Sequence, residues 1–394
     1  MPIYAGVGRS SSPDPKAAGD QATQAALRQL NQKPNILIVF SSVVYDQQKL
    51  IEGIKGVSPD TPIAGCSDAG EITTDGPTTK SVAVMALASP DVKFIIGIGH
   101  GVKADSRGVG KAVAEDIKNK TSEPISLFVM FPDGVNGNGA DIVRGVQDVF
   151  GKNFPIMGGS AGDDFAFKKT FQYFNGEVLS DSVVAVGFSG QFSFGVGVRH
   201  GWEPIGLPMK VTKSEGAVLK ELDGKPALKI YEDSFGKQAE DLIKEPLANL
   251  AYTYPLGMSV EGSDEFLIRD AVLANEKGEI TCAAEIPEGK EVRLMLGDRD
   301  KAIVAAKEAA ESAKEQIGGK RPDAIFVFNC IARYKLLGPK IGDEIKAIQK
   351  VFGETVPMIG FYTYGEQAPL GGKLGPDCNS CFHNETIALL AFSD

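Results

Sequence analysis

The sequence is short of the residues that mark several common classes of protein. Its 394 residues include three histidines and one tryptophan, and its net charge is −10. The basic residues are scattered and form no patch, which argues against nucleic-acid binding. No apolar run reaches the ~18 residues that a membrane-spanning helix needs, which argues against membrane insertion.

Cysteines are few, and the N-terminus lacks the features of a secretory signal. The five cysteines are an odd number in a long chain, which argues against a disulfide framework. The opening "MPIYAGVGRSSS" has neither a basic segment nor an apolar core behind it. We therefore expect a cytoplasmic protein.

What the sequence does contain is a repeat. The stretch "PIAGCSDAGE" is similar to three later stretches, "PIMGGSAGDD", "PLGMSVEGSD" and "PMIGFYTYGE", and each lies about 100 residues after the preceding one. The middle residues vary, whereas the leading proline and two glycines persist. The first glycines of the four copies are Gly65, Gly158, Gly257 and Gly360.

The flanks of these copies predict an α/β fold. Apolar runs at Ile36–Ser42, Ser126–Gly134 and Ala324–Cys330 have the length and composition of buried strands, and helix-length segments follow them. The third copy has only a degraded strand there. We expect four modules of about 100 residues that form two domains of mixed β-sheets flanked by helices. The boundary falls near the proline- and glycine-rich "GWEPIGLPMK", which gives domains of residues 1–205 and 206–394.

The fourth module ends one strand early, at "ETIALLAFSD". The N-terminal strand near Ile3–Val7 resembles "FIIGIGHG", the second strand of the pair that ends the first module: both end in G-x-G and lead through a polar loop into a helix. We therefore predict that it completes the last module beside Thr386–Phe392, which would bring the two chain ends close together.

Nucleotide and hydrolase chemistry are two readings of the glycine loops. No loop matches the phosphate-binding pattern G-x-x-x-x-G-K-[ST], and Glu71 directly after Gly70 would repel a phosphate. Ser160 fits the G-x-S-x-G spacing of a hydrolase nucleophile, and Cys66 is another candidate. The segment after Ser160 reads as a strand, whereas a nucleophile elbow leads into a helix. The hydrolase therefore stays an alternative.

Histidines and cysteines leave a haem or redox role open. His100 and His200 occupy equivalent positions after a strand, and His383 follows the pair Cys378 and Cys381 in "CNSCFH". A second C-x-x-C motif is absent, so we expect no structural metal site. The two thiols are either a labile redox pair or chance neighbours in one loop.

Polar residues behind the buried strands are candidates for ligand binding. Asp133 and Asn136 follow one strand, and Asn329 and Arg333 follow another. Turn chemistry explains the aspartate and asparagines equally well. A guanidinium directly behind a buried strand needs a partner, so Arg333 could hold either Glu366 or the carboxylate of a ligand.

At "FNCIAR…GFYTYGE…FHNET" the chain resembles the C-terminal half of the FIST sensor-domain family. The segments "VFSS…PIAGCSDAGEI" and "PIMGGSAGDD" resemble its N-terminal half, so the resemblance covers nearly the whole chain. Residues that match the C-terminal motif positions are Arg333, Tyr364, Gly365, Glu366, Asn384 and Thr386. The resemblance implies a ligand-sensing module of bacterial signal transduction that recognises small molecules such as amino acids. Some members of the family are haem-containing nitric-oxide sensors.

Together these observations predict a non-catalytic sensor without a cofactor that binds its ligand between the two halves. It would act on a separate signalling protein, such as a histidine kinase or a cyclase. The ligand-binding candidates are Ser67, Asp68, Asp133, Asn136, Ser160, Asp163, Asn329, Arg333, Tyr364 and Glu366. The alternatives are a nitric-oxide sensor that holds haem b through His100, His200 or His383, and a hydrolase that uses Ser160 or Cys66.

Overall fold

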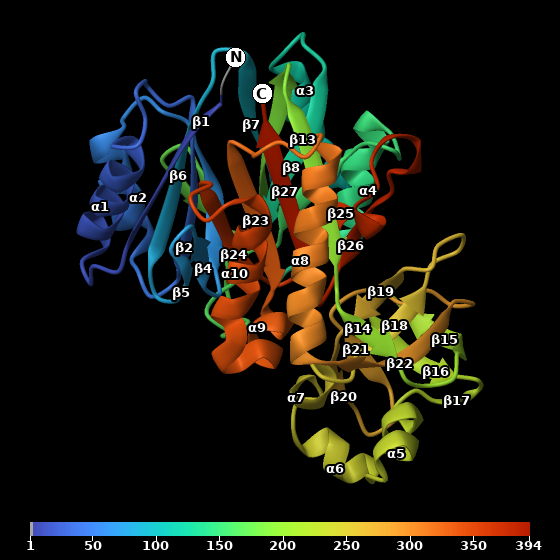
Figure 1. The fold of residues 1–394 in the computed structure, drawn as a ribbon. Helices are drawn as coiled ribbons and strands as arrows, with labels where there is room; N and C mark the ends of the chain where they lie inside the picture. The colour runs from blue at the N-terminus through green and yellow to red at the C-terminus, as the bar shows by residue number, and fades with distance from the viewer. Residues whose placement is uncertain (1–2) are drawn as a thin grey trace.

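A computed structural model describes residues 3–394. The chain forms three β-sheets that enclose a common core, with helices on the outside, and a smaller antiparallel domain projects from one end (Figure 1). The α/β class and the mixed sheets flanked by helices are as predicted. Within residues 3–394, no helix has the length and apolar character to cross a membrane.

The three sheets are built from three copies of one unit. Each copy runs strand, helix, strand, helix, strand, then a hairpin and a last strand. The first copy contains β1 (Tyr4–Ser10), α1 (Pro15–Leu27), β2 (Ile36–Ser42), α2 (Gln47–Val57), β3 (Ile63–Asp68), β4 (Glu71–Thr73), β5 (Gly76–Thr78) and β6 (Val82–Ala88). The second contains β7 (Val92–His100), α3 (Ser106–Asn119), β8 (Ile125–Pro132), α4 (Gly139–Phe150), β9 (Ile156–Gly159), β10 (Gln172–Phe174), β11 (Glu177–Leu179) and β12 (Ser182–Gly190).

The third copy is interrupted after its first strand and resumes about 100 residues later. It contains β13 (Ser193–Arg199), α8 (Arg299–Gln316), β23 (Ala324–Cys330), α9 (Ile331–Leu337), η1 (Gly338–Lys340), α10 (Ile341–Phe352), β24 (Met358–Thr363), β25 (Glu366–Pro369), η2 (Leu370–Gly372), η3 (Gly375–Asp377), β26 (Ser380–His383) and β27 (Ile387–Ser393). The backbone repeats in detail, because a residue one or two positions before the last strand has positive φ in every copy, 56° at Lys80, 52° at Asp181 and 55° at Glu385.

The helices begin where an acidic or amide side chain can cap them. Asp14, Asp46, Asp105, Asn138 and Asp298 precede α1, α2, α3, α4 and α8, and each side chain accepts a hydrogen bond from a backbone N–H in the first turn. Such caps satisfy donors that have no partner inside the helix. They fix the start of the helices that cover the three sheets.

Strand order is the same in the three sheets. In each, the first strand pairs with the last, the last with the second, and the second runs parallel to the third: β1-β6-β2-β3, β7-β12-β8-β9 and β13-β27-β23-β24. Central strands are apolar throughout because both of their faces are buried. In β2, Ile38 and Phe40 point into the common core, whereas Leu37 and Val39 pack under α1 and α2.

Equivalent phenylalanines meet at the centre of the common core. Phe40, Phe131 and Phe328 occupy the same position in their units, one residue after the strand position paired with the glycine. The ring centroids of Phe40 and Phe131 lie 5.4 Å apart, and those of Phe131 and Phe328 lie 6.4 Å apart. Phe361 lies 4.4 Å from Phe40 and 5.9 Å from Phe328, so aromatic packing joins all three units.

The units also exchange hairpins in a closed ring. Strand β4 of the first unit pairs with β24 of the third, β25 of the third pairs with β9 of the second, and β10 of the second pairs with β3 of the first. Each sheet is therefore completed by a neighbour, and no unit can leave without breaking two sheets. Strands from residues 1–205 and from residues 206–394 share sheets. The division of the chain into two domains at this point stays a prediction.

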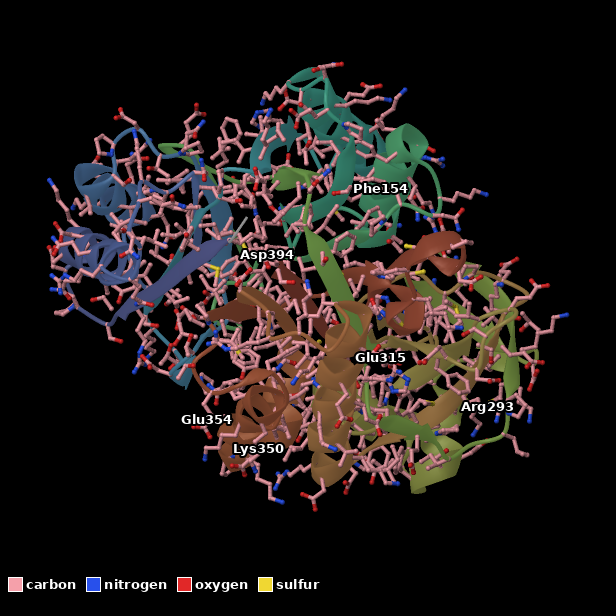
Figure 2. All side chains as sticks on the ribbon, turned by 45° about the horizontal axis from the view of Figure 1, so that its top comes forward. Phe154, Arg293, Glu315, Lys350, Glu354 and Asp394 are labelled. Atoms are coloured by element: carbon pink, nitrogen blue, oxygen red, sulfur yellow. The ribbon has the colours of Figure 1, made fainter. Side chains whose placement is uncertain are left out.

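The segment predicted as the third of four modules has a different structure. It is an inserted domain with a nine-stranded antiparallel sheet, which lies at the far end of the molecule from the first unit (Figures 1 and 2). Its elements are β14 (Trp202–Pro204), β15 (Met209–Glu215), β16 (Val218–Leu222), β17 (Lys225–Pro226), α5 (Lys229–Phe235), α6 (Ala239–Lys244), α7 (Ala248–Ala251), β18 (Leu256–Ser259), β19 (Phe266–Arg269), β20 (Ala271–Ala274), β21 (Ile280–Cys282) and β22 (Glu291–Gly297).

The sequence match at Gly257 is therefore not a structural repeat. A Cβ at Gly65, Gly158 or Gly360 would lie 1.8–2.1 Å from a carbonyl oxygen of the parallel neighbouring strand. At Gly257 it would instead meet the Met295 side chain in an antiparallel sheet. Three of the four predicted glycine positions are equivalent, and the fourth resembles them only in sequence.

The predicted pairing of the N-terminal strand is wrong. β1 pairs with β6, and β27 pairs with β13 and β23 in another sheet. β7 follows β6 in the chain, and β13 follows β12, but each of these strands opens the following unit. The prediction had assigned them to the end of the preceding module. The chain ends are nevertheless close together, since Ile3 and Asp394 both contact Asp323.

The G-x-G pairs in β1, β7 and β13 hold a helix close to the first strand of each sheet. A Cβ at Gly8 would lie 2.1 Å from the Ala22 carbonyl oxygen of α1. One at Gly197 would lie 1.8 Å from the Ala309 carbonyl oxygen of α8. The close helices also cover exposed strand edges: Gln29 bonds both backbone groups of Val7, and Gln316 those of Val196. These glycines are thus packing positions and not a nucleotide motif.

Replacing Gly197 with alanine tests this packing. The new methyl group would force α8 away from β13, so we expect Gly197→Ala to lower the free energy of unfolding by about 1–3 kcal/mol. The control is Gly56→Ala, where a Cβ in α2 meets no atom within 4 Å; it should be neutral or slightly stabilising. Urea unfolding followed by circular dichroism measures both, and equal midpoints would contradict the assignment.

Candidate functional site

The three glycine loops converge and are hydrogen-bonded to one another. Ser67 Oγ donates to the Gly162 carbonyl at 2.7 Å and accepts from the Phe171 N–H. Ser160 N–H donates to the Gly365 carbonyl, and Tyr364 N–H donates to the Ser160 carbonyl. The loops thus join the units at the carboxyl ends of their parallel strands, where ligands often bind in α/β folds.

Most of the predicted ligand residues lie in or beside this junction, and their polar groups are already used. Asp133 accepts from the N–H groups of Val135, Asn136 and Asp181 and from the Asn136 side chain. Ser160 Oγ accepts from Gln367. These bonds fold the loops, which is the turn-chemistry alternative for Asp133 and Asn136.

Asp163 and Tyr364 link two of the loops directly. The Tyr364 hydroxyl donates to Asp163 at 2.6 Å and accepts from the Phe165 N–H. Asp163 also accepts from the N–H groups of Phe167, Lys168 and Lys169. Burial raises the pKa of Tyr364, so the phenol stays a donor.

Three of the predicted residues keep an oxygen without a partner among residues 3–394. These oxygens are Asp68 Oδ2, Asn329 Oδ1 and Glu366 Oε1. Burial raises the pKa of Asp68, with nearby Glu71 adding to the effect, and burial likewise raises the pKa of Glu366. Both carboxyls are therefore poised to be protonated rather than to bind a cationic group.

Arg333 holds a carboxylate, but that carboxylate belongs to the chain. The guanidinium donates to Glu344, and both side chains are completely buried. Its other donors reach the carbonyls of His200 and Ala302, and Asn329 donates to Glu344 at 2.6 Å. The predicted partner Glu366 is therefore wrong, because the packing of α10, which carries Glu344, against α9 does not follow from the sequence. Ligand binding by Arg333 stays a prediction.

The three histidines form hydrogen bonds with groups other than the candidate nucleophiles. His100 Nδ1 lies 3.1 Å from Ser182 Oγ, His200 Nδ1 accepts from the Trp202 N–H, and His383 Nε2 lies 3.0 Å from the Ala368 carbonyl. None of them is hydrogen-bonded to Ser160 or Cys66. The hydrolase alternative therefore lacks a histidine base.

The residues around the histidines do not fit a haem. His383 is 3% exposed with its Nε2 at a carbonyl, and His100 lies on the surface at a strand end. His200 lines a groove of about 270 Å³ whose walls carry charged side chains. These include Arg199, Glu203, Glu265, Lys301 and Glu308. A haem needs a largely apolar slot with an accessible imidazole nitrogen.

A cavity of about 240 Å³ lies where the second unit, the third unit and the inserted domain meet. α4 forms one wall, β18 and β19 form another, and the loop into β26 closes it. Residues from both halves of the chain line it: Ala140, Val143, Arg144, Gln147, Met258, Leu267, Arg269, Glu285, Pro287, Asn379, Ser380, Cys381 and Phe382. None of the ten predicted residues is among them.

An ion pair spans the cavity between α4 and the inserted domain. Arg144 donates through both terminal nitrogens to Glu285 and also to Asp141, and Asn138 donates to Glu285 at 3.3 Å. Burial alone would raise the pKa of Glu285, but the bonds from Arg144 outweigh it and the pKa is lowered. Glu285 is therefore ionised and holds the inserted domain against the second unit.

Arg269, the last residue of β19, also lines the cavity. Its Nε donates to the Glu285 carbonyl at 2.8 Å, and its Nη1 donates to the carbonyls of Ile268 and Phe382. The side chain is only 3% exposed. Burial lowers its pKa to about 10, although the charge of Glu285 acts in the opposite direction.

Cys381 is the part of the "CNSC" motif that reaches the cavity. All five cysteines are free, Cys378 is buried, and Cys381 donates to the Asn379 carbonyl. Burial raises the pKa of Cys381 to about 11, which keeps it a thiol near neutral pH. The motif therefore contributes a small apolar wall to the cavity in this conformation.

Little in the sequence indicated this cavity. Arg144 follows an ordinary amphipathic pattern on a helix, and Arg269 ends a strand in a segment read as a degraded repeat. A signal was available in "FLIRD", where an arginine ends an apolar strand, as at Arg333. Recognising it would have required knowing that no acidic residue pairs with it.

Comparison with known proteins identifies the class. The FIST N domain model matches residues 35–225, and the FIST C domain model matches residues 227–369. The chain therefore belongs to the FIST family. FIST domains are associated with sensing in signal transduction.

Relatives are found in archaea and bacteria. An uncharacterised protein of Methanocaldococcus jannaschii is 29% identical over 84% of this chain and 66% of its own length. An uncharacterised protein of Mycobacterium tuberculosis is 24% identical over 99% of both chains. The chain thus spans about two thirds of the archaeal relative and nearly all of the mycobacterial one.

Similar solved structures are distant. A chorismatase has a TM-score of 0.35 at 10% identity, covering 100% of this chain and 98% of its own. A cyanuric acid hydrolase from A. caulinodans has a TM-score of 0.36 at 9% identity, covering 99% of both. Likeness at this level supports no statement about activity.

The structural role of Arg333 makes a first prediction for this region. Arg333→Met leaves Glu344 buried without its counter-charge and should lower the free energy of unfolding by about 3–5 kcal/mol. Arg107→Met is the control, because Arg107 pairs with Asp148 on the surface and such pairs contribute about 0–1 kcal/mol. The double variant Arg333→Met/Glu344→Met should recover stability in urea unfolding; no recovery would contradict the pairing.

Burial of His383 makes a second prediction, on pH. Burial lowers its pKa from 6.5 to about 4, so the unfolded chain takes up a proton in this interval while the folded protein does not. Stability from this residue is therefore present above pH 6.5 and is lost as the pH falls toward 4. The stability of wild type relative to His383→Gln should fall across that interval by at most roughly 3 kcal/mol. A constant difference between the two in urea unfolding would refute this.

Proposed function

We propose that this FIST protein is a non-catalytic sensor of a small molecule, such as an amino acid, and that the molecule binds in the cavity between the two halves. The observation that carries the proposal is the composition of the cavity wall. α4 comes from residues 1–205, whereas β18, β19 and the loop into β26 come from residues 206–394. A molecule bound there contacts both halves at once.

The cavity has the chemistry of a binding site, and burial keeps its cysteine, Cys381, a thiol near neutral pH. Met258, Leu267, Val143 and Phe382 supply apolar surface, and a few charged groups stand among them. Ligand sites combine these features. At about 240 Å³ the cavity is smaller than the ~300 Å³ lower range of sites for drug-sized molecules, which favours a ligand of amino-acid size.

The arrangement suits signalling because the inserted domain touches the second unit at the cavity. Binding there changes how strongly the domain is held, and a separate partner protein can read the change. A cytoplasmic histidine kinase or cyclase of a bacterial signalling system is the partner class we propose. The haem-based sensor is not supported by the residues around the histidines.

Filling the cavity tests the proposal. Met258→Trp places a larger side chain in it, whereas Val304→Trp makes a similar change in the separate groove beside His200. Native mass spectrometry of freshly purified protein, followed by thermal shifts with a panel of amino acids and short organic acids, identifies the ligand. We expect Met258→Trp to reduce binding at least about tenfold, which corresponds to 1.4 kcal/mol. Binding that Val304→Trp abolishes and Met258→Trp preserves would place the site elsewhere.

A further inference from the structure

The cavity holds a buried arginine, Arg269, whose nearest acidic neighbour, Glu285, is bonded to Arg144 instead. Arg269 is 3% exposed, and its acceptors are the carbonyls of Ile268, Glu285 and Phe382. No carboxylate among residues 3–394 forms an ion pair with it. Burying a charge without a counter-charge is strongly unfavourable. A carboxylate bonded directly to Arg269 would have to come from outside the described residues.

A second arginine in the same protein shows what a satisfied site looks like. Arg333 is also completely buried, and it too donates to backbone carbonyls. In addition it pairs with Glu344, which is buried beside it. Arg269 has no such carboxylate partner among residues 3–394, and it lines a cavity.

The free part of Arg269 is the part that an anion would meet. Its Nε and Nη1 are used by carbonyls, while Nη2 has no hydrogen-bond partner among residues 3–394. A carboxylate can accept hydrogen bonds from Nη2 and supply the missing negative charge. Such charge-assisted bonds gain strength in a buried site, where water competes little.

The rest of the cavity defines the remainder of the ligand. Met258 and Leu267 of the inserted domain and Val143 of α4 are apolar, so they suit a hydrocarbon portion. Glu285, bound by Arg144, also lines the cavity and makes a second anionic group unfavourable there. The ligand is therefore a compact monocarboxylate with an apolar side.

We infer that Arg269 anchors the carboxylate of a small organic acid or amino acid with an apolar side, and that this carboxylate is the counter-ion the fold lacks. The inference rests on the proposed function, because it assigns the chemistry of the same cavity. Arg269 positions the ligand beneath the Arg144–Glu285 pair. The bound acid therefore lies between the inserted domain and the second unit.

The test compares carboxylates with amides of the same shape. Isothermal titration calorimetry is done with isovalerate and isovaleramide, L-leucine and L-leucinamide, and inorganic phosphate. We expect the carboxylates to bind at least about tenfold more tightly than the amides, the range that a hydrogen-bonded charge contributes. Arg269→Met should reduce the ratio to near one. The control Arg293→Met, which removes another guanidinium of the inserted domain outside the cavity, should preserve it (Figure 2).

Each other outcome has a defined meaning. Amides that bind as tightly as carboxylates, or carboxylate binding that survives Arg269→Met, overturn the inference. Phosphate binding in place of the carboxylates also overturns it. If Arg269→Met does not fold, Arg269→Lys serves instead and should weaken carboxylate binding at least severalfold. Binding of a non-carboxylate that Met258→Trp abolishes leaves the proposed function standing, whereas no binding sensitive to Met258→Trp refutes both.

Discussion

The exchange of hairpins between the three units is the constraint on which the rest of the structure depends. Each parallel strand pair is extended by a hairpin from a neighbouring unit, and the ring of exchanges closes on itself. Gly65, Gly158 and Gly360 make this geometry possible, because any side chain there would collide with the carbonyl of the adjacent strand. The three sheets consequently share one core. A change at any one glycine loop is therefore expected to affect the stability of all three units.

This constraint explains why the loop junction is rich in polar residues yet has few free groups. Three chain segments turn sharply at one place, and their backbone donors and acceptors need partners without access to water. Ser67, Asp133, Asp163 and Tyr364 supply them. Polar residues at such a junction look like a binding site in the sequence, although most of them satisfy the fold. The cavity instead forms where the inserted domain, which is outside the ring, meets the second unit.

Local features of this fold could be predicted from the sequence, and long-range pairings could not. Apolar runs predicted β2, β8 and β23 closely, since strands buried on both faces need apolar residues throughout. The copy at Gly257 and the partner of the N-terminal strand were predicted wrongly, because spacing does not reveal which strands pair across 100 residues. Likewise, the sequence indicated that Arg333 needs a partner. That this partner is Glu344 depends on how α9 and α10 pack. Arg269 and Arg144 were missed because each is unremarkable until the inserted domain is placed.

The two buried arginines differ in whether the chain supplies a directly bonded carboxylate. Where the chain provides the counter-charge, as at Arg333, the site is complete in the isolated protein and adding a ligand changes nothing. Where it does not, as at Arg269, part of the favourable interaction is left for a ligand to supply. Because Arg269 is bonded to the loop of Glu285, and Glu285 is bonded to Arg144 of α4, an anion at Arg269 acts directly on the contact between two parts of the molecule. On our proposal, an anion bound at Arg269 would therefore couple ligand binding to the position of the inserted domain.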